Sequence, residues 1–385
     1  MSTVGDFDDD LDHLASELNL VAPQRTAEAP GTHRSIETWL RRLRELQGSD
    51  LLLVSGAPPV VRTSGRLVPT SELLLSPDDI VAAVTPLISS RHQDVYQRGS
   101  AVDLAFTVRG LGRFRMNYHR ERGHAAAAIR ALPLRIPALN DLHFTHDIGL
   151  LSTLPRGLVL VCGPTGSGKT TTVASLVAEI NNRDARHILT VEDPIEYDHA
   201  HRRSLVEQIE IGADAPDFPT ALRAAMRQAP DVIVVGEMRD PETMRIALTA
   251  AETGHLVLAT LHATDSAAAV SRIADAFPAE RQNAVRQELA MALAAVLTQT
   301  LVPTLAGALV PAAELLVVSY GARQHIRKNA LQHLHQEITI TRKAGSFTFE
   351  ESLARLVEMG ALDRSEARIR APHAEEFDSI SQPPR

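Results

Sequence analysis

The chain has 385 residues, of which 44% are hydrophobic and 22% charged, and its formal net charge is −8. This is the composition of a soluble globular protein with room for two domains, and no run reaches the roughly 18 consecutive apolar residues of a membrane-spanning helix. A single cysteine, Cys162, excludes an internal disulfide framework and a four-cysteine zinc site.

The negative charge is concentrated at the two ends of the chain. Residues 1–30 hold seven acidic residues and one base, and residues 371–385 hold three acidic residues and one base, so the body between them is neutral. A neutral body lacks the overall positive charge that favours binding to nucleic acid. A local basic patch is the alternative. The acidic N-terminus also lacks the basic and apolar regions of a secretory signal, and we expect a cytoplasmic protein.

Residues 1–31 are acidic and then rich in Ala and Pro, which predicts a disordered N-terminal tail. A solvated tail is the simpler interpretation, and a partner-binding tail is the alternative.

Residues 32–142 are predicted to form a small N-terminal α+β domain. Apolar residues at helical spacing predict an amphipathic helix over 35–47, with Ser35 as its cap and Gly48 at its end. Turn residues separate several short apolar runs that are typical of strands. The predicted strands cover 50–55, 60–62, 102–108 and 113–119, and a helix is predicted over 77–96.

Residues 143–370 are predicted to form a larger α/β domain, because strand-like runs alternate there with helical patterns. Such alternation indicates a largely parallel sheet with helices on both faces. The predicted strands are 157–162, 187–191, 232–235 and 256–260. Helices are expected to dominate after Ser266, and residues 371–385, with three prolines and no apolar pattern, predict a flexible C-terminal tail.

The strongest motif is GPTGSGKT at residues 163–170, which fits the phosphate-binding P-loop pattern with every fixed position filled. A buried-strand run precedes it and a helical segment follows it, as the chemistry requires. Glycines let backbone N–H groups surround a triphosphate, and the helix N-terminus adds its positive end. The predicted ATP-binding residues are Gly163, Pro164, Thr165, Gly166, Ser167, Gly168, Lys169, Thr170 and Thr171.

Within this loop, Lys169 would bridge the β- and γ-phosphates and the Thr170 hydroxyl would hold Mg²⁺. Cys162, next to the loop, is expected to be a small buried hydrophobic residue rather than a reactive thiol.

Acidic residues follow the next two strands. Three carboxylates occur in residues 192–196 (EDPIE), after the strand 187–191, and the carboxyl ends of parallel strands lie where such sheets bind ligands. The alternative is a solvated acidic turn. Glu237 follows the run 231–236, which resembles a Walker B strand, and Glu237 is the candidate there for Mg²⁺. Asp231 lies at the other end of that strand and is not nominated.

A third polar turn follows the strand 256–260 and contains His262. His262 would sense the γ-phosphate or hydrogen-bond Glu237, whereas a structural histidine is the alternative.

The order of these motifs, GPTGSGKT, HILTVEDPIEY and APDVIVVGEMRDP through LATLHATD, closely resembles the secretion and type IV pilus ATPases from about Ser49 to Arg370. The family names them Walker A, Asp box, Walker B and His box, and residues 49–59 resemble its PAS-like N-terminal domain. The resemblance implies an α/β fold, with a RecA-like P-loop NTPase domain and a smaller N-terminal α+β PAS-like domain.

The branch of the family follows from two features. Extension and type II secretion ATPases usually carry a four-cysteine zinc motif, which one cysteine excludes. Retraction motors (the PilT family) carry an AIRNLIRE-like helix, and residues 321–328 (GARQHIRK) keep its two arginines and central isoleucine. The usual SDLHL reads SDLLL, with Leu52 replacing histidine, and a usual basic turn reads AGAL at 306–309. A divergent retraction motor, an accessory retraction motor and a secretion ATPase are the alternatives.

The resemblance also implies roles for individual residues. Glu196 corresponds to the catalytic base, Glu237 to the glutamate that supports Mg²⁺ and water, and His262 to the His box. Arginines of the N-terminal domain reach phosphate charge in this family, and a strand's solvent face is the alternative for them here. The matching candidates are Arg113, Arg115 and Arg130.

The function that the resemblance implies is a hexameric ATPase that powers pilus retraction and twitching motility from the cytoplasmic face of the inner membrane. ATP would bind between the two domains, with a hinge near residues 140–151. The expected partners are further copies of the chain, an inner-membrane pilus platform protein and a paralogous ATPase, without nucleic acid or membrane insertion. A nucleotide-binding regulatory subunit with little hydrolysis and a RecA-like nucleic-acid motor are the rivals.

Overall fold

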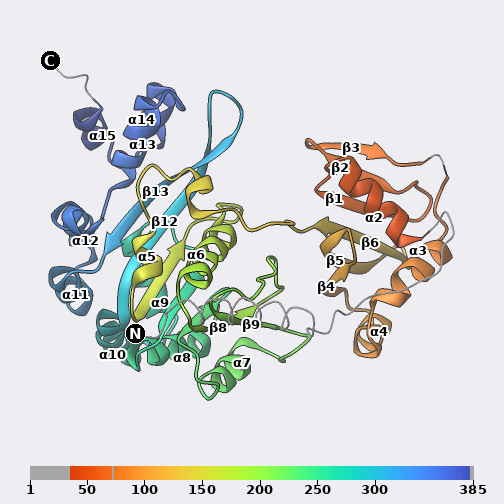
Figure 1. The fold of residues 1–385 in the computed structure, drawn as a ribbon, viewed down its shortest axis with the longest axis horizontal. Helices are drawn as coiled ribbons and strands as arrows, with labels where there is room; N and C mark the ends of the chain where they lie inside the picture. Colours follow the sequence, from red (N-terminus) through yellow and green to blue (C-terminus); the bar gives the residue numbers. More distant parts are fainter. Residues whose placement is uncertain (1–34, 72, 382–385) are drawn as a thin grey trace, which may run out of the picture. The chain divides into compact units, whose positions relative to one another are not determined.

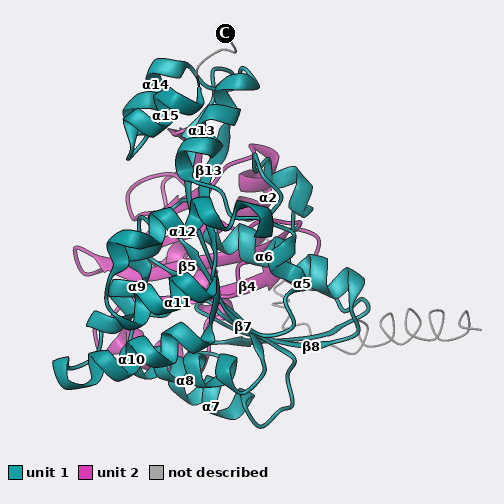
Figure 2. Ribbon diagram, turned by 90° about the vertical axis from the view of Figure 1, so that its left-hand side faces the viewer, with its two compact units in different colours: residues 1–19, 136–193, 199–385 teal, residues 20–135, 194–198 magenta. Residues whose placement is uncertain are grey.

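A computed structural model describes residues 35–71 and 73–381, so the predicted tail at 1–31 lies outside the described residues. The chain divides into two compact units (Figure 2). Within the described part, unit 2 ends at Arg135 and also contains the short segment Pro194–Asp198, and unit 1 holds the rest. The division at 135/136 falls before the predicted domain boundary at 142/143.

Unit 2 begins with the predicted amphipathic helix, α2 (Ile36–Glu45), which the structure confirms. The Ser35 hydroxyl accepts a hydrogen bond from the amide of Thr38 and so caps the helix. Its apolar face, with Trp39 and Leu40 buried, packs in the core of the unit.

The sheet of unit 2 has six strands in the order β3-β2-β1-β6-β5-β4, and every neighbouring pair is antiparallel. Side chains alternate across it, so Phe114 and Met116 lie in the core and Arg115, between them, faces the other way. The strands are β1 (Asp50–Leu53), β2 (Val60–Thr63), β3 (Arg66–Pro69), β4 (Val102–Val108), β5 (Gly112–Glu121) and β6 (His124–Ala131).

The single helix predicted over 77–96 is wrong. The structure has α3 (Pro77–Val84), a 3₁₀ turn (Thr85–Leu87) and α4 (Ser90–Gln97). Pro86 has no N–H to continue the α-helical bonds, and the backbone then becomes extended at Ile88, with φ −106° and ψ 137°. Ser89 then caps the second helix by accepting from His92 N.

Unit 1 contains a seven-stranded sheet in the order β13-β12-β7-β11-β10-β8-β9, parallel except for the β12–β13 pair. The four predicted strands are confirmed to within one residue. The strands are β7 (Gly157–Cys162), β8 (His187–Glu192), β9 (Leu205–Glu210), β10 (Val232–Val235), β11 (Leu256–Leu261), β12 (Leu293–Pro303) and β13 (Leu309–Val317).

Helices cover both faces of this sheet (Figure 1), as predicted, so β7, β10 and β11 are buried at every position. One face packs against α5 (Leu150–Thr153) and α6 (Lys169–Arg183). The other face packs against a larger set of helices. They are α7 (Phe218–Ala225), α8 (Pro241–Glu252), α9 (Ser266–Asp275), α10 (Ala279–Ala292), α11 (Tyr320–Arg327) and α12 (Leu334–Ile340).

The expectation that helices dominate after Ser266 is only partly right, because β12 and β13 form a long hairpin there. The Leu- and Ala-rich start of β12 has the composition of a helix and follows α10 without a gap. Pairing with β7 in the centre of the sheet overrides that local preference.

The flexible tail predicted at 371–385 is wrong for its described residues. After α13 (Phe349–Glu358) and α14 (Arg364–Arg370), the chain forms α15 (Ala374–Ile380). Phe377 is fully buried there in a small apolar cluster with Leu353 and Leu356. One aromatic side chain therefore fixes a segment whose composition suggested a loose end. None of the helices in the described part of the chain has the length and hydrophobicity needed to cross a membrane.

Candidate active site

The P-loop joins β7 to α6, and its backbone geometry depends on glycine. Gly163 has φ +148° and Gly168 has φ +87°, in the region that favours glycine. A Cβ atom on Gly163 would lie 2.2 Å from the carbonyl oxygen of Gln299, so no other residue fits. The loop therefore lies directly against β12 and opens onto the N-terminus of α6.

Lys169, the first residue of α6, is folded back onto the loop. Its Nζ donates hydrogen bonds to the carbonyl oxygens of Gly163, at 2.9 Å, and Pro164, at 2.8 Å. The side chain is only 8% exposed, and burial lowers the pKa of its ammonium while the charge of Glu237 acts in the opposite direction. Lys169 thus provides a buried positive charge at the mouth of the loop.

Gln299, on β12, forms hydrogen bonds to the P-loop and to α6 through its side-chain amide. Its amide Nε2 donates to the carbonyl oxygen of Ser167 at 2.6 Å, and its Oε1 accepts from the Thr172 hydroxyl at 2.9 Å. Gln299 is buried and bonds both the loop and the first turn of α6. One side chain therefore fixes the position of the loop relative to the helix that follows it.

Glu237 lies at the carboxyl end of β10, as the sequence predicted. Its Oε1 is 3.2 Å from Nε2 of His262, and its Oε2 is 2.7 Å from the Arg239 guanidinium. Burial alone would raise the pKa of Glu237, but Arg239, then His262 and Lys169, lower it below its usual value. The carboxylate is thus held ionised near the P-loop lysine.

Backbone bonds fix the turns that carry these two residues. The amide of Met238 donates to the carbonyl oxygen of Thr260 at 3.1 Å, and the Thr260 hydroxyl donates to the carbonyl oxygen of Gly236. Asp231, which is not nominated for the metal, lies at the opposite end of β10 and accepts a hydrogen bond from the amide of His187 at 2.8 Å.

The remaining predicted residues belong to unit 2. Arg113 and Arg115 alternate with the buried Phe114 on β5, and Arg130 is the cross-strand partner of Arg115, so the three arginines share the sheet face opposite the core. Arg113 Nε donates to the carbonyl oxygen of Ile195 at 2.8 Å. The segment that carries the half-buried Glu196 is thereby attached to β5.

The other two arginines pair with acidic residues. Arg130 Nε lies 2.9 Å from Asp50, and Arg115 lies 3.9 Å from Asp103. Both arginines keep much of their side-chain surface exposed. The structure therefore groups Lys169, Glu237 and His262 in unit 1, and Glu196 with the three arginines in unit 2.

The comparison with known proteins decides the family. The family described as type II/IV secretion system protein matches residues 139–365. The type IV pilus retraction ATPase PilT of Pseudomonas aeruginosa is 39% identical over 86% of this chain and 96% of its own length. The chain belongs to the PilT family of type II/IV secretion-system ATPases.

Two further relatives agree with this membership. The type IV pilus ATPase PilU of P. aeruginosa is 36% identical over 89% of this chain and 90% of its own length. A crystal structure of the pilus retraction motor PilT with bound ADP superimposes with a TM-score of 0.83, at 39% identity over 90% of this chain and 99% of that one. The PilT-family chain is accordingly an ATPase with a RecA-like domain and an N-terminal domain.

The P-loop of this PilT-family chain fits a nucleotide phosphate. The Ser167 hydroxyl is buried and has no hydrogen-bond partner among the described residues, which leaves a donor inside the loop. Lys169 supplies positive charge, and Thr170 and Thr171 follow in the first turn of α6. Amides at a helix N-terminus, a free hydroxyl and an ammonium are the groups that bind phosphate oxygens.

Two residues of this site were missed in the sequence. Gln299 gave a weak signal, because it is one of three polar residues in a row (Thr-Gln-Thr) within an otherwise apolar strand. Arg239 lies two residues after Glu237, and only the structure shows that its guanidinium pairs with that carboxylate.

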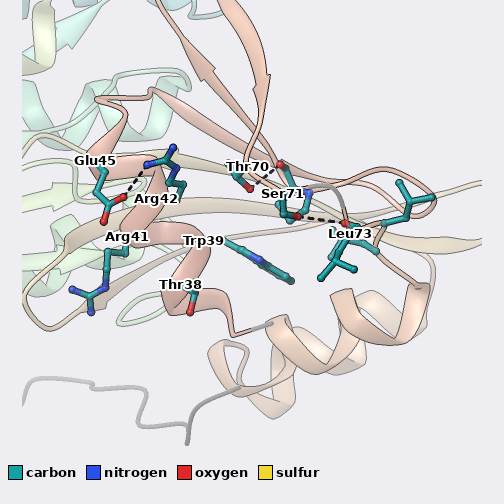
Figure 3. Close-up of a pocket in the computed structure, with 11 residues that line it drawn as sticks. Thr38, Trp39, Arg41, Arg42, Glu45, Thr70, Ser71 and Leu73 are labelled. Carbon is teal, nitrogen blue, oxygen red and sulfur yellow. Dashed lines mark hydrogen bonds and ion pairs between the residues drawn. The ribbon is translucent and has the colours of Figure 1, made fainter. Parts of the chain in front are cut away.

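A separate cavity of about 220 Å³ lies in unit 2 (Figure 3). Trp39 and Leu73 line it together with the basic side chains of Arg41 and Arg42. None of the predicted ATP-binding or catalytic residues belongs to its wall.

Proposed function

We propose that this chain is the subunit of a hexameric motor that hydrolyses ATP to power type IV pilus retraction and twitching motility. The observation that carries the proposal is the grouping of Lys169, Glu237 and His262 in a chain that matches PilT along almost its entire length. A complete set of phosphate-binding and acidic groups favours a working motor over a regulatory subunit that binds nucleotide without hydrolysing it.

In unit 1, the P-loop amides and Lys169 bind the β- and γ-phosphates of ATP. Thr170 and Glu237 are the residues that would hold Mg²⁺, which neutralises phosphate charge when it is bound. Glu237 suits this role because Arg239 and His262 keep it ionised. The contact of His262 with Glu237 supports a role for His262 in responding to the γ-phosphate.

In unit 2, Glu196 orients the attacking water and accepts its proton, as the catalytic base. Arg113, Arg115 and Arg130 supply positive charge to the transferring phosphoryl group. The exposed arginine face of the sheet and the bond from Arg113 to the Ile195 carbonyl support this assignment.

The motor acts at the cytoplasmic face of the inner membrane, where it binds the pilus platform protein. The likeness to PilU, together with Leu52 at the histidine position of the family motif, favours one second candidate, an accessory retraction ATPase that works beside a paralogous motor.

A deletion strain tests the role in the cell. Loss of surface motility together with excess surface pili supports retraction, and loss of pili altogether contradicts it, because extension would then have failed. Complementation with wild-type protein should restore motility, and complementation with Glu237→Ala should not. If the deletion strain still retracts its pili but with reduced force, the accessory role is favoured instead.

A purified-protein assay tests the catalytic base. Glu196→Gln should bind ATP normally and lose at least about a hundredfold in turnover, since general-base catalysis contributes that much. Asp198→Asn, an exposed acid in the same segment, is the matched control and should keep wild-type turnover. Equal turnover in Glu196→Gln and wild type would remove Glu196 from the mechanism.

A further inference from the structure

A second group of chemically active side chains lies within unit 1, in residues that the proposed function does not use. His335 on α12, Glu350 on α13 and Glu376 on α15 come together, and each offers one ligand atom that lies within 4.8 Å of the other two. Residues from three helices that are separated along the chain thus meet at one point.

The fold holds these three helices in place independently of the cluster. Both α12 and α13 pack against β13, and α13 packs against α15 around the buried Phe377 (Figure 1). The cluster side chains are themselves oriented by neighbours. Glu350 Oε1 accepts from the amide of His373 at 2.8 Å, and Glu376 Oε1 accepts from the Thr348 hydroxyl at 3.2 Å.

The charges in the cluster do not balance. Glu350 is only 1% exposed, and no Lys or Arg in the described part of the chain forms an ion pair with Glu350 or Glu376. His335 Nε2 lies 2.7 Å from Glu376 Oε2 and offers at most one positive charge to two carboxylates. Burying a carboxylate without a compensating cation is costly, so the site as it stands calls for further positive charge.

We propose that His335, Glu350 and Glu376 bind a divalent transition-metal ion, with Zn²⁺ as the best match. One imidazole nitrogen and two carboxylate oxygens are zinc ligands, and imidazole disfavours Ca²⁺ and Mg²⁺, which take oxygen ligands. A dication balances both carboxylates. Three protein ligands leave a fourth position for water.

The site would act as a structural clamp. It joins α15 to α12 and α13, and the family match ends at residue 365, before α15 begins. The metal therefore adds to the buried Phe377 in attaching the last described helix to the body of unit 1.

Zinc binding to the full-length protein tests the proposal. The protein is stripped of metal with a chelator, saturated with Mg²⁺-ADP so that the P-loop site is filled, and titrated with Zn²⁺ by equilibrium dialysis and elemental analysis. Wild type should bind one equivalent. At a hundredfold excess over its dissociation constant, Zn²⁺ should raise Tm by roughly 5 °C, because it binds the folded state only.

Three variants locate the site. His335→Gln, Glu350→Gln and Glu376→Gln each replace a ligand with a side chain of similar shape, and each should weaken Zn²⁺ binding by at least about tenfold. Glu350 is buried, so Glu350→Gln can fail to fold. Glu376→Gln then provides the test, because Glu376 is partly exposed. His325→Gln is the matched control, since His325 pairs with Glu337 at 3.6 Å but belongs to no such cluster, and it should bind as wild type does.

Equal Zn²⁺ affinity in wild type, His335→Gln and Glu376→Gln would overturn the proposal, and so would the absence of bound Zn²⁺ in wild type. ATPase activity is not the readout. A failed zinc titration therefore leaves the proposed motor function untouched, and a failed motor assay leaves the zinc site untouched.

Discussion

The side-chain amide of Gln299 donates a hydrogen bond of 2.6 Å to the carbonyl oxygen of Ser167, across 132 residues of sequence. Because the other end of the same amide accepts from Thr172, the bond makes β12 a support for the P-loop on both sides of Lys169. The loop that binds phosphate therefore depends on a strand that has no P-loop signature of its own.

Gln299→Leu should loosen the P-loop, because leucine fills similar space and makes neither bond. We expect KM for ATP to rise by about tenfold, equivalent to the loss of roughly 1.4 kcal/mol of hydrogen bonding, with a smaller change in kcat. Steady-state kinetics of the purified protein measure both constants.

Thr300→Val is the matched control for Gln299→Leu, since Thr300 is the next residue on β12 and its side chain makes no hydrogen bond to the described residues. It should keep the wild-type KM. A Gln299→Leu protein with normal KM and kcat would show that the contact does not position the loop.

Glu237→Ala should lower ATP turnover by about a hundredfold or more while nucleotide binding persists, since the carboxylate acts on charge that develops during phosphoryl transfer. Phosphate release and equilibrium binding of a fluorescent ATP analogue separate the two effects. Glu252→Gln, an exposed acid at the end of α8, should behave as wild type. Wild-type turnover in Glu237→Ala would refute the assignment of the site.

Cys162 should resist alkylation in the native protein at pH 8 to 9, because burial raises the pKa of its thiol to about 12. An unfolded thiol ionises near pH 8.5, whereas the buried thiol stays neutral. The resulting contribution to the free energy of unfolding is fully present below about pH 8.5 and is lost as the pH rises towards 12. Urea midpoints at increasing alkaline pH should therefore fall more steeply for wild type than for Cys162→Ala. Identical slopes, or rapid alkylation of native protein, would contradict the buried, neutral thiol.

Phe377→Ala should destabilise the C-terminal helices by about 3–4 kcal/mol, the usual cost of removing a fully buried phenyl ring. Urea unfolding and limited proteolysis around α15 measure the effect. Ile369→Ala is the control, because Ile369 is 80% exposed and its loss should change stability little. If the two variants have equal stability, α15 is not held by its aromatic side chain.

The sequence predicted those parts of the fold where local composition and tertiary structure agree. The strands around the P-loop were found because their apolar, largely β-branched runs, such as Val232–Val235, are buried on both faces of a parallel sheet. Glu237 is predictable because it follows such a strand, and Lys169 because it belongs to the P-loop motif between β7 and α6. Pro86 is also a local signal, because a proline within a helical pattern ends the α-helix near that position.

The missed features depend on contacts between distant residues. The start of β12 is rich in Leu and Ala and becomes a strand only by pairing with β7. Gln299 acquires its role from the same pairing, and α15 is ordered by one phenylalanine that packs on α13. Local pattern carries no information about such partners, so these features could not be assigned from the sequence alone.

The position of β7 between β11 and β12 has a consequence for how the protein folds. The P-loop is synthesised early, but the strand that supports it emerges from the ribosome only much later, after four further strands. Contacts of such high sequence separation form slowly, and domains fold as units. A nascent chain that ends before β12 should therefore be unable to bind ATP tightly. Tight nucleotide binding then indicates that β12 has joined the sheet.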